Sequence, residues 1–289
     1  MRDQFRTVGL YVNAHKPPPV EAAARLIPWL RERGVQPIFE VSVAQWLRGE
    51  TGAPISEVLA ADLVVVLGGD GTVLSAARDL ASCDAPMLTV RFGSFGFMAE
   101  VEPDAIEPAL ERVLAGDFSV EERPMLRVVR VSEGEKTHDV VAMNDVAVVR
   151  AASPRLAKLD AAVDGEPLAT YSGDGVVVST ATGSTAYSLA AGGPIVHPTV
   201  SALLLTPICP HALHFRPLLL PAEASLSLRI PDMGGEAQAS VDGQITFPVL
   251  FGDTLTISRA ACKARFITLG ASSFYSKVRT RLRWGERLL

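Results

Sequence analysis

Short apolar runs alternate with helix-compatible segments in the first part of the chain. The runs occupy residues 7–12, 37–43, 62–67 and 87–92. Residues 20–33 carry apolar side chains at helical spacing, although Pro28 predicts a kink or an early end there. Buried strands that alternate with helices predict a mostly parallel sheet covered on both faces, which is a Rossmann-like α/β arrangement.

The pattern changes after about Asp117, where strand-like runs follow one another closely. Candidate strands lie at residues 126–131, 140–150, 159–163, 175–179, 224–230, 237–241 and 254–258. Glu133-Gly134 and Asp164-Gly165 are typical of tight turns between such strands. Many strands at short intervals predict an antiparallel, β-rich domain, and residues 272–284 predict a final helix.

Composition narrows the class of protein. The 289 residues are 48% hydrophobic and 20% charged, which is typical of a globular protein. A net charge of -5 does not favour nucleic acid as a partner, and no apolar run approaches the roughly 20 residues that span a bilayer. Cys83, Cys209 and Cys262 are far apart and are expected to be reduced thiols. We therefore expect a cytoplasmic protein that binds neither nucleic acid nor membrane.

A glycine-rich turn follows the third apolar run. Gly68-Gly69-Asp70-Gly71-Thr72 separates that run from a helix-compatible stretch, residues 73–80. Glycine tolerates positive φ and lets a ligand approach the backbone, and the free N–H groups of a helix start favour a phosphate. A carboxylate at this position is useful if Asp70 takes a proton from a hydroxyl or helps to hold a metal ion. The turn therefore predicts a phosphoryl-transfer site.

Two polar residues, Asn144-Asp145, interrupt the apolar run at 140–150. Buried polar groups need partners, so the pair either forms a turn at the edge of a strand or reaches into a polar pocket. The pattern alone does not separate these two interpretations.

Hydroxyl-bearing and small residues are dense between Tyr171 and Pro194. Asp174 lies between two glycines, and the stretch Thr182-Gly183-Ser184-Thr185-Ala186-Tyr187-Ser188 precedes a predicted helix. Ser and Thr are favoured helix N-caps, which is one explanation. The alternative is a polar cradle for a nucleotide, in which Tyr187 offers a ring face to a base. The number of small polar residues exceeds what capping needs, which favours the cradle.

Other candidate motifs point to structure rather than chemistry. Cys209-Pro210-His211 and His214 form one cluster without a second to complete a metal site, so a turn is expected. The basic end, residues 277–283, predicts a solvated helix. The sequence contains neither a P-loop of the G-x-x-x-x-G-K-[ST] kind nor a G-x-S-x-G nucleophile elbow.

Taken together, these motifs resemble the bacterial NAD kinase family. The similarity runs in order through Gly68–Thr72, Asn144-Asp145, Asp174-Gly175, Thr182–Ser188, Ala191–Val196, Pro207–His211 and Val241-Asp242-Gly243-Gln244. The glycine turn alone is shared with diacylglycerol and sphingosine kinases and with phosphofructokinases. The T-G-S-T-A-Y-S stretch is far more specific to NAD kinases.

The resemblance implies that Mg²⁺ or another divalent cation assists transfer of the γ-phosphoryl of ATP to the 2′-hydroxyl of the adenosine ribose of NAD, which gives NADP. It also implies two domains: an α/β phosphate-binding domain at 1–118, completed by 263–289, and a β-rich NAD-binding domain at 119–262. Members of the family assemble as dimers or tetramers, so a homodimer or homotetramer is expected.

The resemblance also assigns site residues. Asp70 corresponds to the base that acts on the 2′-hydroxyl, and no protein ligand is assigned to the metal ion. The expected phosphate-binding residues are Gly68, Gly69, Gly71 and Thr72. The expected NAD-binding residues are Asp70, Gly71, Asn144, Asp145, Arg155, Asp174, Thr185, Ala186, Tyr187, Ser188, Leu189, Ala190 and Gln244.

Two positions depart from the family pattern. The family's G-x-N-x-G-x-L-G-F-L motif corresponds to Thr89–Met98, which includes a second glycine-spaced motif, Gly93–Phe97. Arg91 replaces the usual asparagine of this segment and offers a cation near phosphates. Ser172 stands where some members carry arginine, which leaves the choice between NAD and NADH open. Polyphosphate as donor, inhibition by NADP(H) and the size of the oligomer also stay open. The alternatives are a lipid kinase of the diacylglycerol or sphingosine type, or a catalytically silent nucleotide-binding regulator.

Overall fold

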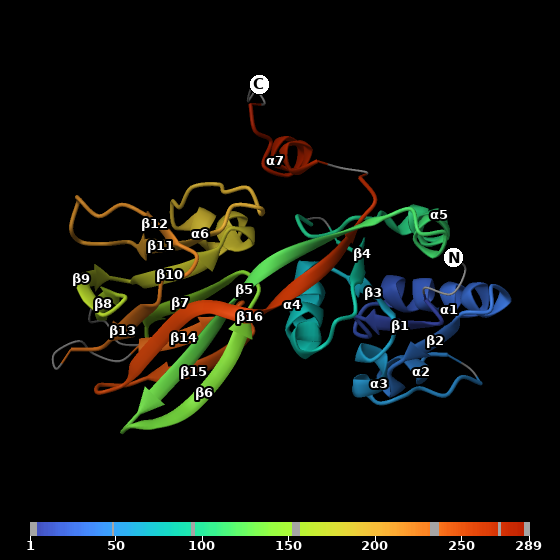
Figure 1. Ribbon diagram of the computed structural model, residues 1–289, viewed down its shortest axis with the longest axis horizontal. Coiled ribbons are helices and arrows are strands. Elements are labelled where there is room, and N and C mark those ends of the chain that lie inside the picture. Colours follow the sequence, from blue (N-terminus) through green and yellow to red (C-terminus); the bar gives the residue numbers. More distant parts are fainter. Residues whose placement is uncertain are drawn as a thin grey trace. The chain divides into compact units, whose positions relative to one another are not determined.

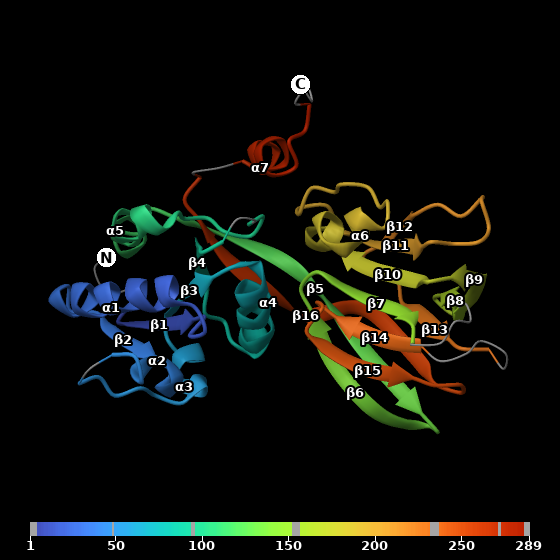
Figure 2. The same cartoon turned by 180° about the vertical axis from the view of Figure 1, so that it is seen from behind.

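Two units of packed secondary structure make up the chain in the computed structural model (Figures 1 and 2). The structure describes residues 5–47, 49–93, 96–151, 157–231, 237–270 and 273–285. The first unit comprises residues 1–122 and 264–289, and the second comprises residues 123–263. Strands β5 (Ser119–Ser132) and β16 (Thr254–Thr268) each run from one unit into the other.

The first unit is built on a parallel sheet. Its strand order is β2 (Gln36–Phe39), β1 (Thr7–Val12), β3 (Leu63–Gly68) and β4 (Met87–Arg91), followed by the end of β16. All of these neighbours pair in parallel, with Val64 opposite Met87 and Phe266 of β16 beside Met87. Every residue of β3 is buried, as expected for a strand covered on both faces. The predicted α/β fold of this part of the chain is confirmed.

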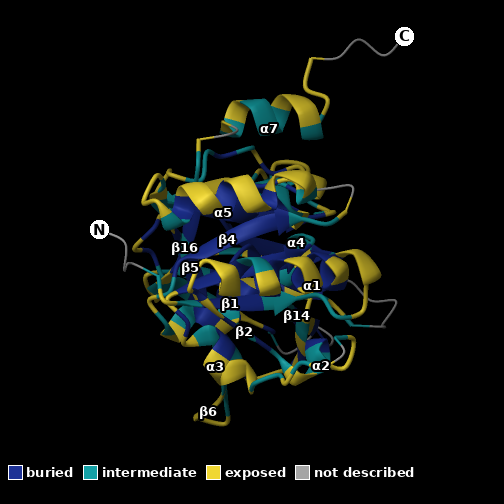
Figure 3. Ribbon diagram, turned by 90° about the vertical axis from the view of Figure 1, so that its right-hand side faces the viewer, coloured by how far each residue is buried: buried dark blue, intermediate teal, exposed yellow. Residues whose placement is uncertain are grey.

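Helices cover both faces of this sheet. Helices α1 (Pro17–Glu32) and α5 (Ile106–Leu114) share one apolar core with β1, β3 and β4, and they lie in front of the buried strands in Figure 3. On the other face, α3 (Ile55–Leu59) approaches β1 so closely that a Cβ on Gly9 would lie 2.2 Å from the carbonyl oxygen of Val58. Short helix α2 (Val41–Ala44), α4 (Asp70–Asp79) and α7 (Phe274–Arg281) complete the unit.

One local prediction in the first unit holds with a shifted start, and another is wrong. The helix predicted at residues 20–33 is α1, which begins at Pro17 and continues past Pro28 instead of ending there, because its first turn tolerates proline and its apolar stripe packs against the sheet. The run 37–43 is a strand only as far as Phe39. The chain segment at Ala53 returns to pair with Glu40 and accepts the N–H of Val41 at 3.2 Å, and a helix follows.

The second unit is β-rich and mainly antiparallel. One sheet has the order β12 (Leu218–Pro221), β11 (Ala202–Ile208), β10 (Gly175–Thr180), β7 (Asp145–Arg150), β14 (Ala237–Val241) and β15 (Ile245–Val249). The other joins β9 (Glu166–Gly173), β8 (Ala157–Val163), β13 (Leu226–Arg229), β16, β5 and β6 (Glu135–Ala142). Buried side chains from both sheets form one core, and the predicted β-rich fold is confirmed.

The run 140–150, predicted as a single strand, is divided between these two sheets. Strand β6 ends at Ala142 and pairs with β5, whereas β7 begins at Asp145 and pairs with β10 and β14. Met143 and Asn144 therefore connect two sheets and belong to neither ladder.

None of the described helices is long and apolar enough to cross a membrane.

Candidate functional site

The glycine turn joins the central strand of the first unit to helix α4. Strand β3 ends at Gly68, Gly69 is the N-cap, and Asp70 is the first helical residue. An acidic residue in the first turn of a helix is favoured by the helix dipole. The turn lies at the carboxyl end of a parallel strand, which is where ligands bind in sheets of this kind.

Space, rather than unusual backbone angles, explains the glycine at the end of β3. Neither Gly68 nor Gly69 adopts positive φ, and Gly69 is extended with φ -91° and ψ -176°. A Cβ on Gly68 would lie 2.3 Å from the Thr72 hydroxyl oxygen, so a larger residue would push the first helical turn away from the strand. Glycine is therefore needed at position 68 to leave space for the first helical turn rather than to provide left-handed backbone.

Neighbouring loops hold the turn in place. The Asp70 Oδ2 atom accepts the backbone N–H of Phe97 at 3.2 Å, and the Gly68 carbonyl accepts the N–H of Phe92 at 2.9 Å. The amide of Asn13 donates to the Thr72 hydroxyl at 3.5 Å. The second glycine-spaced motif is thus brought beside Asp70, although its residues 94 and 95 lie outside the described residues.

Arg91 pairs with a carboxylate. Its Nε and Nη2 atoms donate to Glu102 Oε2 at 2.8 and 2.6 Å, and Arg281 lies 3.5 Å from the same carboxylate. The methylene groups of Arg91 also pack beneath Gly96, where a Cβ would lie 3.0 Å from Cδ. The Arg91 charge is therefore compensated within the first unit.

In the second unit, the connection between the two sheets converges on one carboxylate. Asp242, 8% exposed, accepts the N–H groups of Met143 at 3.0 Å, Asn144 at 2.8 Å and Asp145 at 3.2 Å. Asn144 and Asp145 are themselves 9% and 5% exposed. Both sequence interpretations of Asn144-Asp145 hold in part, since the pair marks a break between strands and its side chains are buried.

Asp145 is buried beside a second acidic group. Burial, and next the charge of Asp242, raise the pKa of Asp145 from 3.8 to about 7, while the backbone N–H of Tyr187 opposes this by donating to the carboxylate. The structure thus brings together three segments that are far apart in the sequence, around Asp145, Tyr187 and Asp242. Ser179 of β10 lies directly opposite Asp145 in the sheet.

Three buried polar atoms gather in this region. Within the described residues, Asn144 Oδ1, Ser179 Oγ and Thr182 Oγ1 have no hydrogen-bond partner. Such atoms are rare in folded proteins and mark positions where a polar ligand gains contacts. The Asn144 backbone also lies against Gly183, the residue after Thr182, because a Cβ on Gly183 would lie 2.1 Å from the Asn144 carbonyl oxygen.

The hydroxyl-rich stretch is held by tertiary hydrogen bonds. It folds as a short 3-10 helix, Thr182–Thr185, and as α6, Tyr187–Ala190, and neither has a side-chain N-cap. The Ser184 hydroxyl instead bonds to both backbone groups of Val196, and the Ser188 hydroxyl lies 2.9 Å from that of Thr206. Helix capping therefore explains little of the stretch: the Thr180 hydroxyl accepts the Gly183 N–H at 3.0 Å, whereas the hydroxyls of Ser184 and Ser188 make tertiary contacts. Thr185, Ala186, Leu189 and Ala190 keep partial or full exposure, and the Tyr187 side chain is 42% exposed.

The remaining predicted site residues lie elsewhere in the second unit. Asp174 connects β9 to β10, and its Oδ1 lies 3.0 Å from Arg150 Nε. Gln244 lies in the turn between β14 and β15, after Asp242 and Gly243 at positive φ. Arg155 lies outside the described residues. Cys209 begins an exposed turn at φ 45°, and the following His211 donates its N–H to the Ser172 carbonyl.

Asp242 and Ser179 are two buried polar residues beside Asp145 that sequence reasoning did not assign to the site. Asp242-Gly243 after an apolar strand is also the pattern of an ordinary hairpin turn, so nothing in the spacing distinguishes it from Asp164-Gly165. The family resemblance at Val241–Gln244 is a sequence signal at this position, and burial beside the connection between the two sheets shows how the Asp242 side chain differs from that of Asp164.

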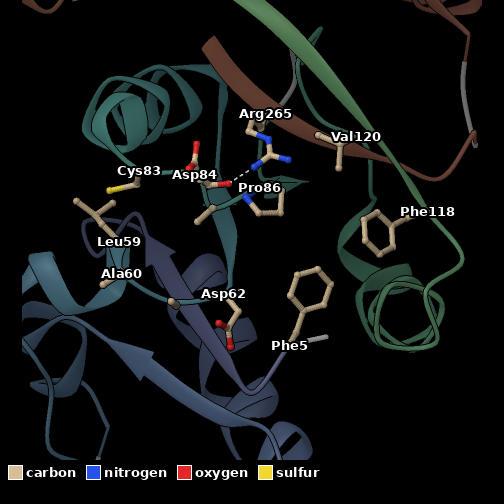
Figure 4. Close-up of a pocket in the computed structure, with 12 residues that line it drawn as sticks. Phe5, Leu59, Ala60, Asp62, Cys83, Asp84, Pro86, Phe118, Val120 and Arg265 are labelled. Carbon is tan, nitrogen blue, oxygen red and sulfur yellow. Dashed lines mark hydrogen bonds between the residues drawn. The ribbon is translucent and has the colours of Figure 1, made fainter. Parts of the chain in front are cut away.

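A separate hollow of about 480 Å³ lies in the first unit, where β1, β3 and β4 begin (Figure 4). Two of its charged side chains bind the protein's own backbone, although Arg265 Nε is a buried atom without a hydrogen-bond partner among the described residues. Asp62 accepts the N–H groups of Arg6 and Thr7 at 2.8 Å each, and Arg265 donates to the Asp84 carbonyl. This hollow is at the opposite end of the strands from the glycine turn and forms no part of the candidate site.

The raised pKa of Asp145 makes a prediction about stability. Between about pH 4 and pH 7 the folded protein holds a proton that the unfolded chain has released, so the free energy of unfolding falls as pH rises across this window. Asp145→Asn has no such proton. The variant should therefore gain stability relative to the wild type with rising pH, by up to about 1.4 kcal/mol for each pH unit in the window. Urea unfolding at several pH values measures this, and a difference that is constant with pH contradicts it.

The close approach at Gly183 makes a second prediction. In Gly183→Ala the new methyl group meets the backbone of Asn144 rather than a flexible side chain, so the connection between the sheets must move. We expect a loss of about 1–3 kcal/mol in the free energy of unfolding. Chemical denaturation measures this loss, and a variant as stable as the wild type would show that the backbone gives way freely.

Comparisons with known proteins cover both units. Residues 8–118 match the model of the ATP-NAD kinase N-terminal domain, and residues 143–269 match that of the ATP-NAD kinase C-terminal domain. The NAD kinase of Heliobacterium modesticaldum is 41% identical over 281 residues, which cover 97% of this chain and 99% of the relative. The NAD kinase of Geotalea daltonii is 38% identical over 284 residues, which cover 98% and 100%.

Solved structures agree. A yeast NADH kinase, crystallised with NADH, superposes with a TM-score of 0.90 at 27% identity and covers 100% of this chain and 91% of its own. An NAD kinase from Archaeoglobus fulgidus, solved with ATP, superposes with a TM-score of 0.74 at 23% identity, covers 96% and 98%, and supports the fold alone. Relatives that are 38% and 41% identical span nearly the whole chain, and both of its units match the family's two domain models. The chain therefore belongs to the NAD kinase family.

Proposed function

We propose that this protein is an NAD kinase, which transfers the γ-phosphoryl group of ATP to the 2′-hydroxyl of the adenosine ribose of NAD and forms NADP. The observation that carries the proposal is the match of both units to the ATP-NAD kinase domains, with Asp70 kept at the first position of the helix that follows the glycine turn. A lipid kinase is not favoured, because the similarity includes the nucleotide cradle of the second unit as well as the turn. A silent regulator is not favoured, because Asp70 stands at the phosphate-binding turn and binding alone gains nothing from a carboxylate beside phosphate.

Asp70 is the proposed base. One of its carboxylate oxygens accepts the Phe97 N–H, which orients the carboxylate. An ordinary carboxylate is a weak base for an alcohol, so Asp70 orients the hydroxyl and accepts its proton late, as negative charge moves onto the transferring group. The proposed phosphate contacts are the backbone and hydroxyl groups of Gly68, Gly69, Gly71 and Thr72, at a helix N-terminus that favours anions.

The second unit is proposed to bind NAD. The unpartnered Asn144 Oδ1 and the exposed ring of Tyr187 support contacts to polar groups and to a base, respectively. Asp174 is proposed to accept an amide or amino group of NAD in addition to its ion pair with Arg150. The other proposed contacts are Asp145, Arg155, Thr185, Ala186, Ser188, Leu189, Ala190 and Gln244, together with Asp70 and Gly71 of the first unit.

A divalent cation fits the residues present, but only as a partner of the substrate. The described residues contain no group of three or more His, Cys, Asp or Glu side chains that could hold a metal ion by themselves. Mg²⁺ is usually held by one or two carboxylates together with substrate phosphates, an arrangement that Asp70 can support. When bound, the cation neutralises charge on the phosphate oxygens.

The wider setting is also a proposal. We infer a phosphate-binding domain at 1–118 with 263–289 and an NAD-binding domain at 119–262, a cytoplasmic location, and a homodimer or homotetramer. The support for the domain bounds, the location and the oligomer is the membership of the NAD kinase family. Because the similar yeast protein is an NADH kinase, both NAD and NADH belong in the assay.

The test is NADP formation from ATP, Mg²⁺ and NAD, followed with an NADP-specific dehydrogenase. Asp70→Asn should lower kcat by roughly 10²–10⁴-fold with little change in KM, since the amide keeps the shape of the carboxylate but accepts no proton. Asp79→Asn, at the other end of the same helix, is the matched control and should retain activity. A wild type that forms no NADP contradicts the kinase function. Full activity of Asp70→Asn contradicts only the role of the base.

A further inference from the structure

Asp242 is buried in the second unit and has no role in the function proposed above. We propose that Asp242 is a positioning residue of the NAD site, which holds the backbone of Met143–Asp145. Of the two neighbouring carboxyl groups, Asp145 is then the one that stays protonated and donates a hydrogen bond to NAD. This inference rests on the proposed function, because it concerns the same nucleotide site.

The first support is the geometry of the hydrogen bonds. Asp242 Oδ1 accepts the N–H groups of Asn144 and Asp145 at 2.8 and 3.2 Å, and Oδ2 accepts that of Met143 at 3.0 Å. The Asp242 N–H in turn donates to the Asp145 carbonyl at 2.9 Å. Successive backbone N–H groups that converge on one oxyanion form an anion-binding nest, and hydrogen bonds to a charged acceptor are stronger than neutral ones.

The second support is that two backbone N–H groups at this point have no partner in a strand ladder. Met143 and Asn144 lie between β6 and β7 and therefore have no ladder to receive their N–H groups. A buried N–H without a partner is costly, and the Asp242 side chain meets this need. The left-handed backbone of Asp242 and Gly243, with φ 51° and 67°, turns the chain directly after β14.

The third support is the unequal environment of the two carboxyl groups. Asp242 receives three backbone N–H donors, whereas Asp145 receives the N–H of Tyr187. When two buried carboxyl groups are neighbours, the one with more donors keeps the negative charge and the other keeps the proton. Burial and the Asp242 charge accordingly raise the pKa of Asp145 to about 7.

Among the residues that the structure describes, the elements packed against Asp145 present no compensating cation to it. The residue opposite it on β10 is the neutral Ser179, the end of β14 presents Asp242, and α6 presents the backbone N–H and the neutral phenol of Tyr187. A protonated Asp145 both donates and accepts hydrogen bonds, whereas an ionised Asp145 only accepts them and adds a negative charge beside an anionic ligand. We therefore expect NAD to bind more weakly as pH rises through about 7 and Asp145 loses its proton.

The test compares Asp242→Asn with the wild type by calorimetric titration of NAD and by kinetics over a range of pH. The variant should raise both the Kd and the KM for NAD at least tenfold, with kcat and the KM for ATP changed less than threefold. The pH at which NAD binding weakens should also move to a lower value, because the neighbouring charge is gone. Asp164→Asn is the matched control, since Asp164-Gly165 is an exposed turn of the same left-handed kind in the same unit.

A purely structural role predicts a different result. It would reduce the active fraction, and thus kcat, while the Kd for NAD and its pH dependence stay as in the wild type. That result would overturn the proposal. If Asp242→Asn does not fold, Asp145→Asn tests the same idea, because its permanently neutral amide should bind NAD with no weakening at high pH. Persistent weakening in that variant also overturns the proposal. A wild type that binds NAD with the expected pH dependence but forms no NADP supports this inference and contradicts the kinase function.

Discussion

The backbone that passes from one sheet to the other at Met143 and Asn144 is the constraint on which the second unit depends. Peptide N–H groups that leave a strand ladder inside a protein must find other acceptors. Here a carboxylate from the end of β14 receives three of them, while Gly183 leaves just enough space for the hydroxyl-rich stretch to lie against the same backbone. One connection thereby brings Asn144, Asp145 and Tyr187 into the same small region of the second unit.

In the first unit, close packing of the backbone rather than a charged side chain fixes the corresponding turn. A parallel strand ends, a helix begins, and the Gly68 backbone meets the Thr72 side chain too closely for any Cβ. Phe92 and Phe97 supply backbone N–H groups to the Gly68 carbonyl and the Asp70 carboxylate, respectively. The turn is therefore shaped by its neighbours on the next loop, and Asp70 is oriented by a contact 27 residues away in the sequence.

Much of the fold could be predicted from apolar patterns, and the errors in the strand prediction have identifiable causes. The strands at 62–67, 87–92, 175–179 and 237–241 were predicted to within a residue or two, because each is a short apolar run between polar or glycine-rich segments. The run 140–150 was predicted as one strand because burial on both sides of Asn144 hides the change of sheet. Strands β9, β11, β12 and β15 were not predicted, although β9 and β15 pair with the strands just before them in the chain. Each of the four strands contains a proline, which weakens the sequence pattern of a strand.

The sequence by itself determined the family, the two kinds of fold and the identity of the chemical groups, because these depend on local composition and on motifs in a fixed order. Only the tertiary structure decided what those groups experience. It paired Arg91 with Glu102, used the hydroxyls of Ser184 and Ser188 for tertiary hydrogen bonds, and placed Asp242 beside Asp145. The reason is that burial and the distance between charges are set by segments that meet only in three dimensions, and these two quantities control where a proton resides.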